Sequence, residues 1–209
     1  MAEIEYFYSA HSGYAYIGSA KFMEIAEAGG HTIAHRPMDL RAVVAVTGPG
    51  PTNSLTPQRR AYFSGRVIER WAEARNIGIL ARPTYHDNDI ALSSGMLIAA
   101  LQQGIDVGPL AHRMLEAHWR DDADLADRET LARISEEVGI EPKSLLDVAL
   151  SPEIQAIYEA NTKEAIERSV FGSPTYFVGG DMFYGQDHLD LVERALVKPF
   201  SGTWPRSLG

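Results

Sequence analysis

The spacing of apolar residues near the N-terminus changes from strand-like to helix-like and back. Ile4–Tyr8 is a short run of β-forming residues, which predicts a buried first strand. From Tyr14 to Ile25 apolar residues recur at helical spacing, and Gly29-Gly30 ends that helix. Thr32–His35 predicts a second strand, which ends at Pro37. This β-α-β order predicts two parallel strands joined by a right-handed crossover.

A second strand-forming region lies near the C-terminus. Thr175–Val178 is rich in β-formers, and Gly179-Gly180 suits a two-residue hairpin turn. Met182–Tyr184 forms the returning strand, and a helix is expected from about Asp187 to Val197. The C-terminal part therefore reads β-β-α.

The middle of the chain has a helical pattern throughout. Met38–Leu55 is expected to be a long loop, since its Gly and Pro residues interrupt regular structure. Thr56-Pro57 then combines a cap with a first-turn proline, and starts a helix that runs to about Arg75. The other expected helices cover residues 89–103, the segment from 108, and residues 128–138, 142–150 and 152–169.

This order predicts an α/β fold with a thioredoxin-like core, in which a helical insertion separates the βαβ and ββα halves. A plain doubly wound sheet would need strands in the middle of the chain, and residues 56–169 offer none. We expect a single domain over residues 1–209. Its core covers about 1–40 and 168–198, with the insertion at about 55–168.

Composition narrows the possible partners. The 209 residues carry a net charge of −9, which argues against nucleic acid or an anionic membrane as the main partner. No apolar run approaches the roughly 18 residues needed to span a bilayer, and the N-terminus lacks the pattern of a signal peptide. We therefore expect a cytoplasmic protein. The chain has no cysteine, which excludes disulfide chemistry by its own thiols.

In a thioredoxin-like arrangement, the loop after the first strand meets the loop that holds Pro174. A cis Ser173–Pro174 bond fits this place, although an ordinary trans proline that ends a loop is the alternative. The N-terminus of the first helix points at the same place and favours an anion. Ser12 stands where the redox members of this fold carry the Cys-x-x-Cys motif. Because the chain has no thiol of its own, the Ser12 hydroxyl can only donate a hydrogen bond to the sulfur of another molecule. A simple N-cap is the other interpretation of Ser12.

Both ends of the chain carry extended motifs. The N-terminal one is I-E-Y-F-Y-S-A-H-S-G-Y-A-Y-I-G-S, and the C-terminal one is F-G-S-P-T-Y-F-V-G-G-D-M-F-Y-G-Q-D-H-L. Together with His118-Trp119 and Asp122 in the middle, they resemble the 2-hydroxychromene-2-carboxylate isomerases and kappa-class glutathione transferases. The resemblance covers nearly the whole chain.

The resemblance implies a DsbA-like fold, bound glutathione as cofactor and a homodimer. Ser12 would stand beside the glutathione thiol. Ser173, before Pro174, would pair its backbone with the cysteinyl part of glutathione like an added strand. Gln186 and Asp187 would hold the γ-glutamyl end, with Asp187 facing its ammonium group.

The N-terminal motif departs from the family pattern. Gly13 replaces a proline, Ala15 a second serine, and Ser9 a position where aspartate is common. His11 replaces a small residue beside Ser12. His11 could act in the site, as a base or as a cation that favours the thiolate. The alternative is that it is a loop residue that points to solvent.

Two further groups of residues have side chains that could contact a ligand. The resemblance implies that Asn53 and Tyr62, in the segment that would cover the site, handle the substrate. A solvated helix face explains Tyr62 equally well. His31 and His35 share a strand face but lack further ligands nearby, so no metal site is expected.

These observations lead to two hypotheses on function. The first is a glutathione-dependent isomerase or transferase that acts on a small, aromatic-derived electrophile, with Ser12 and His11 as catalytic candidates. The second is a non-catalytic glutathione- or peptide-binding protein of the same fold. A thiol-disulfide oxidoreductase is excluded because the chain has no cysteine.

Overall fold

The two ends of the chain build one four-stranded sheet. The computed structural model describes residues 1–48, 56–202 and 204–205. The strand order is β2-β1-β3-β4. The strands are β1 (Glu3–Tyr8), β2 (Thr32–Pro37), β3 (Thr175–Val178) and β4 (Asp181–Tyr184). As predicted, β1 and β2 are parallel, while β1–β3 and β3–β4 are antiparallel.

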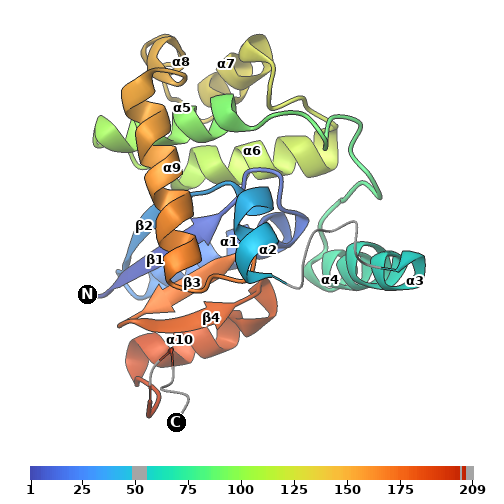
Figure 1. The fold of residues 1–209 in the computed structure, drawn as a ribbon, viewed down its shortest axis with the longest axis vertical. Helices are drawn as coiled ribbons and strands as arrows, with labels where there is room; N and C mark the ends of the chain where they lie inside the picture. The colour runs from blue at the N-terminus through green and yellow to red at the C-terminus, as the bar shows by residue number, and fades with distance from the viewer. Residues whose placement is uncertain (49–55, 203, 206–209) are drawn as a thin grey trace.

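Helices surround this sheet, and between residues 56 and 169 the chain has no strand. Figure 1 shows α5 to α8 gathered above the sheet, α10 below it, and α3 and α4 projecting to one side. The helices are α1 (Gly13–Ala28), α2 (Leu40–Thr47), α3 (Pro57–Ala61), α4 (Val67–Arg75), α5 (Ala91–Gln102), α6 (Gly108–Asp121), α7 (Arg128–Glu137), α8 (Lys143–Val148), α9 (Pro152–Glu167) and α10 (Leu189–Val197). The described residues also form the π-helical turn η2 (Tyr62–Arg66) and the 3-10 helix η3 (Gln186–His188).

Alternation along β1 fills two separate cores. Tyr6 and Tyr8 belong to the large core, which includes residues of α1, α5, α6 and α10. Phe7 belongs to a smaller core on the other face, with Val43 of α2 and Ala165 of α9. Because side chains of a strand alternate between its faces, this pattern fixes the register of the central strand between two helical layers.

The expectation of a long loop over Met38–Leu55 is wrong where α2 lies. Asp39 caps this helix, since its carboxylate accepts hydrogen bonds from the N–H groups of Arg41 and Ala42. Val43 is fully buried in the smaller core. The sequence interpretation gave too much weight to the Gly and Pro residues that follow α2 and overlooked this cap and its apolar face.

The C-terminal hairpin has the predicted turn. Gly179 and Gly180 have positive φ angles of 58° and 86°, which a two-residue hairpin turn requires and glycine adopts without strain. The expected helix from Asp187 begins instead as η3 and continues as α10.

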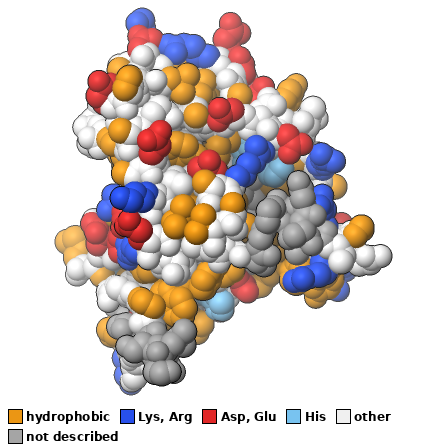
Figure 2. Space-filling model, viewed as in Figure 1, with side chains coloured by type: hydrophobic (Ala, Val, Ile, Leu, Met, Phe, Trp, Pro, Cys, Tyr) orange, Lys and Arg blue, Asp and Glu red, His pale blue; other side chains and the backbone are white. Residues whose placement is uncertain are grey.

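On the face shown in Figure 2, Lys and Arg side chains are interspersed with Asp and Glu. Among the described residues, every helix is too short or too polar to cross a bilayer.

Candidate functional site

Ser12 links the start of α1 to the proline loop. As the N-cap of α1, its Oγ accepts a hydrogen bond from the N–H of Ala15 at 3.1 Å. The same hydroxyl donates to the carbonyl oxygen of Ser173 at 3.0 Å, and the side chain is buried. The N-cap interpretation is therefore confirmed, and the hydroxyl has in addition a partner 161 residues away.

The proline loop is fixed from both sides. The Ser173–Pro174 peptide bond is cis, as the sequence predicts. Ser173 Oγ accepts a hydrogen bond from the N–H of Ser9 at 3.0 Å, and the carbonyl of Pro174 accepts one from Gly185 at 2.9 Å. The loop after β1, the proline loop and the start of η3 thus form one hydrogen-bonded corner.

Gln186 and Asp187 occupy this corner in different ways. Gln186 is buried against α1, where a Cβ at Gly18 would lie 2.6 Å from the Cβ of Gln186. Its Oε1 accepts a hydrogen bond from Arg75 at 3.0 Å, whereas its buried Nε2 has no partner among the described residues. Asp187 is exposed. Gln186 therefore anchors α4 to the corner, and the Asp187 carboxylate is open to a ligand.

The segment expected to handle substrate lies beside the first turn of α1. The hydroxyl of Tyr14 donates to the carbonyl of Phe63 at 2.6 Å, which attaches η2 to α1. Burial raises the pKa of Tyr14 to about 12, and the charges of Tyr184, Asp187 and Tyr62 add to the effect. Tyr62 itself is half exposed. Asn53 lies outside the described residues.

His11 is buried, so the interpretation as a residue that points to solvent is wrong. Only 7% of the residue is exposed, and its ring stacks on that of His118 with centroids 4.3 Å apart. Burial, together with a smaller contribution from the rings of His118 and His86, lowers the pKa of His11 to about 3. The imidazole is therefore neutral at physiological pH. It is no cation beside Ser12, and it is a weak base.

Trp119 supports the loop around Ser12. Its Nε1 donates to the carbonyl of His11 at 3.1 Å. A Cβ at Gly13 would lie only 2.9 Å from Cζ2 of its ring. This contact accounts for glycine at position 13, because any larger residue there would overlap the indole.

Sequence reasoning missed the surroundings of His11. His86 comes from the segment between α4 and α5, which has no periodic pattern and gave no signal. His118 and Trp119 lie on α6, where an apolar helix face suggested only core packing. The resemblance included both residues, and this was the one available indication that they belong near the site.

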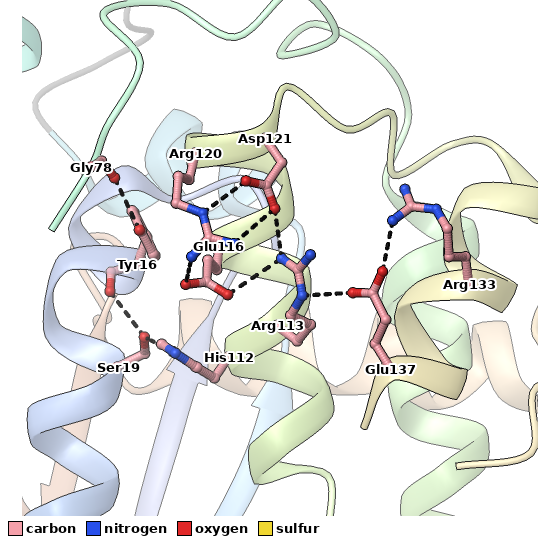
Figure 3. A network of polar contacts seen from close by, with 10 residues as sticks. All are labelled: Tyr16, Ser19, Gly78, His112, Arg113, Glu116, Arg120, Asp121, Arg133 and Glu137. Carbon is pink, nitrogen blue, oxygen red and sulfur yellow. Dashed lines mark hydrogen bonds and ion pairs between the residues drawn. The ribbon is translucent and has the colours of Figure 1, made fainter. Parts of the chain in front are cut away.

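A cavity of about 400 Å³ lies elsewhere, between α1, α4 and α6. Figure 3 shows the polar network beside it, in which Tyr16 donates to Gly78 at 3.0 Å and Ser19 bonds to His112 at 2.7 Å. Arg113 extends the network to Glu137 of α7 at 2.8 Å. None of the predicted site residues that the structure describes lines this cavity, and the network fastens α6 to its neighbours.

The fold and the corner around Ser12 define the class of the protein. Residues 3–197 match the family model of the DSBA-like thioredoxin domain, so the chain belongs to this family. Among solved structures, that of a 2-hydroxychromene-2-carboxylate isomerase matches with a TM-score of 0.75 and 24% identity, over 94% of this chain and 95% of the other. A probable DsbA oxidoreductase from Streptomyces coelicolor matches with a TM-score of 0.74 and 16% identity, over 100% of this chain and 94% of the other.

Comparison of the sequence with those of curated proteins gives relatives that share one more specific name. The 2-hydroxychromene-2-carboxylate isomerase of Sphingobium xenophagum is 28% identical over 201 residues, which cover 93% of this chain and 97% of the relative. The protein of the same name from Pseudomonas sp. (strain C18) is 27% identical over 195 residues, or 92% of this chain and 89% of the relative. The family resemblance read from the sequence is thus confirmed, and the relatives indicate an isomerase-like enzyme.

Proposed function

We propose that this protein is a glutathione-dependent isomerase that acts on an aromatic-derived electrophile, as the name of its 2-hydroxychromene-2-carboxylate isomerase relatives suggests. The observation that carries the proposal is the Ser12 hydroxyl at the N-terminus of α1, opposite the Ser173 carbonyl, in a chain without cysteine. A thiol that reacts at this place must come from a bound molecule.

The residues of the corner suit a small peptide thiol. The Ser173 carbonyl accepts a hydrogen bond from a side chain rather than from a strand, so a peptide N–H can take over that bond. Gln186 Nε2 is buried without a partner, which a carbonyl or carboxylate of a ligand would satisfy. The exposed carboxylate of Asp187 suits an ammonium group. These features support glutathione as the cofactor.

Bound glutathione would supply a thiolate nucleophile that adds to a conjugated substrate and later leaves. Ser12 has one hydroxyl proton, which it now donates to Ser173. Once the Ser173 carbonyl accepts from a ligand, the Ser12 hydroxyl is free to donate to sulfur. A hydrogen bond to the charged form lowers a thiol pKa, and the dipole of α1 favours the same charge by about 0.3–2 kcal/mol.

The residues around Ser12 would exclude water on one side of the site and contact the substrate on the other. The neutral His11 and the indole of Trp119 fill the space behind the loop and keep water from it. Tyr14 and Tyr62 border the exposed side, where an aromatic-derived substrate would meet aromatic rings.

The test is the interconversion of 2-hydroxychromene-2-carboxylate and its ring-opened isomer, followed by absorbance with and without glutathione. We expect turnover by the native protein only when glutathione is present, and a large loss of kcat in Ser12→Ala. Glutathione binding without turnover would favour the alternative, a non-catalytic glutathione-binding protein. The changes at Gly13 and Ala15 are the observations that keep this alternative open. Turnover that is independent of glutathione would refute the proposal.

A further inference from the structure

Three histidines from distant parts of the chain meet behind the Ser12 loop. His11 follows β1, His86 lies between α4 and α5, and His118 is on α6. One ring nitrogen from each lies within 4.8 Å of the other two. In contrast, His31 and His35 bond separately to Ala2 and Tyr8.

The hydrogen bonds of the cluster assign the ring protons. His118 Nδ1 lies 3.1 Å from the carbonyl of Ala123, to which only an N–H can donate. Nε2 of the neutral His118 ring then carries the lone pair, which accepts a hydrogen bond from His86 Nδ1 at 3.1 Å. His11 Nε2 is buried and has no hydrogen-bond partner among the described residues.

This arrangement is incomplete without a ligand. A buried ring nitrogen without a partner costs about 1–3 kcal/mol. Nitrogen from neutral imidazole is a preferred ligand of Zn²⁺ and of other late transition metals. The bond from His118 Nδ1 to a backbone carbonyl is the support that metal-ligating histidines usually have. The carboxylates of Asp87, Asp122 and Asp124 act electrostatically on these rings and would complement a cation, whereas Arg41 and Arg82 act in the opposite direction.

We propose that His11, His86 and His118 form a binding site for one divalent transition metal ion, for which Zn²⁺ suits the donor set best. Two adjustments accompany binding. The His11 and His118 rings are within 8° of parallel, so one ring must turn before their lone pairs converge. His86 shifts its proton from Nδ1 to Nε2, which leaves the ring neutral. Three protein ligands leave a fourth position open on a tetrahedral ion.

The cavity between α1, α4 and α6 does not offer a comparable site. Its His112 is already bonded to Ser19, and its Glu116 is paired with Arg113 and Arg120. The histidine cluster, by contrast, combines ring nitrogens within 4.8 Å of one another with an unpartnered buried atom.

The proposal is tested with glutathione-free, untagged protein titrated with Co²⁺, followed by visible absorption, and then with Zn²⁺. We expect one equivalent of Co²⁺ with the intense spectrum of a four-coordinate ion, displaced by one equivalent of Zn²⁺. His86→Asn should weaken binding by at least about tenfold, because it removes a ligand from the half-buried side of the cluster. His31→Asn is the matched control and should bind like the native protein.

Absence of stoichiometric binding by the native protein would overturn the proposal, whatever the variants do. Equal affinity of His86→Asn and the native protein would overturn it as well. If circular dichroism shows that His86→Asn is not folded, His11→Asn takes its place, with the same expected loss. Since no step uses glutathione or turnover, these results are independent of the proposed isomerase activity.

Discussion

Replacing Ser12 by alanine removes one hydroxyl that makes two hydrogen bonds. Loss of the N-cap bond to Ala15 costs about 1 kcal/mol. The buried carbonyl of Ser173 also loses its donor, which costs about 1–3 kcal/mol. We therefore expect Ser12→Ala to lower the free energy of unfolding by about 2–4 kcal/mol, measured by urea denaturation with far-UV circular dichroism.

Ser151→Ala provides the matched control. Ser151 caps α9 by accepting from the N–H of Ile154 at 3.4 Å, and its further bond, to Glu153, is at the surface. Removing it should cost about 1 kcal/mol or less. If both variants lose the same stability, the Ser12–Ser173 bond contributes nothing and the corner is not held as described.

The same variant tests the chemistry of the site. If Ser12 donates to a bound thiolate, Ser12→Ala should raise the apparent pKa of bound glutathione, followed by thiolate absorbance, while affinity at pH 7 falls only slightly. Each pKa unit corresponds to about 1.36 kcal/mol. His11→Asn should leave this pKa unchanged, because the His11 ring is neutral. The reverse pattern would make His11 the activator and refute the role of Ser12.

Two further predictions concern charge. Asp187→Ala should weaken glutathione binding by about 1 kcal/mol, or roughly fivefold, because the attraction of an exposed carboxylate is screened by water. This loss should exceed that of Ser12→Ala, and calorimetry that finds equal affinities for the two variants would exclude the placement of Asp187 at the ammonium group. The pKa of His11 is about 3 in the folded chain and near 6.5 when unfolded, so its contribution to stability is complete above pH 6.5 and is lost as the pH falls toward 3. His11→Asn should therefore reduce the slope of the unfolding free energy against pH, measured between pH 6 and pH 4, by up to about 1.4 kcal/mol per pH unit. An unchanged slope would contradict the burial of a neutral His11 ring.

The features that the sequence predicted are those encoded by local patterns. Strand β1 has a run of β-formers, and α1 has a helical period that ends at two glycines. The glycine pair of the hairpin turn is a local signal of the same kind. Each is dictated by residues within a few positions of one another, so one sequence suffices to find them.

The features that it missed depend on tertiary contacts. Helix α2 is short, and its stability comes from burying Val43 in the smaller core, to which residues more than 100 positions away, such as Ala165, contribute. The histidine cluster joins three segments whose spacing follows no motif. For Gln186, the motif indicated a ligand contact, whereas the fold gives its Oε1 to Arg75. Such contacts follow from how the segments pack, which periodicity does not describe.

Gly13 shows how packing from α6 accounts for a departure from the family motif. An added Cβ would lie 2.9 Å from Cζ2 of Trp119, whose ring is buried and tethered through Nε1 to the carbonyl of His11. Because the ring has no room to move, Gly13→Ala should overpack the site and cost about 1–3 kcal/mol. Gly65→Ala is the control, since a Cβ there meets no atom of the described residues within 4 Å, and it should stabilise the protein by up to about 1 kcal/mol.

A double-mutant cycle identifies the indole as the cause. Trp119→Phe removes Cζ2 along with the Nε1–H donor. The loss in free energy of unfolding caused by Gly13→Ala should therefore be smaller, by at least about 1 kcal/mol, in the Trp119→Phe protein than in the native one. Urea denaturation of the four proteins measures this difference. If Gly13→Ala instead stabilises the native protein as Gly65→Ala does, the indole does not exclude a side chain at position 13. The glycine beside Ser12 would then need another explanation, such as the freedom of the loop to move when a ligand binds.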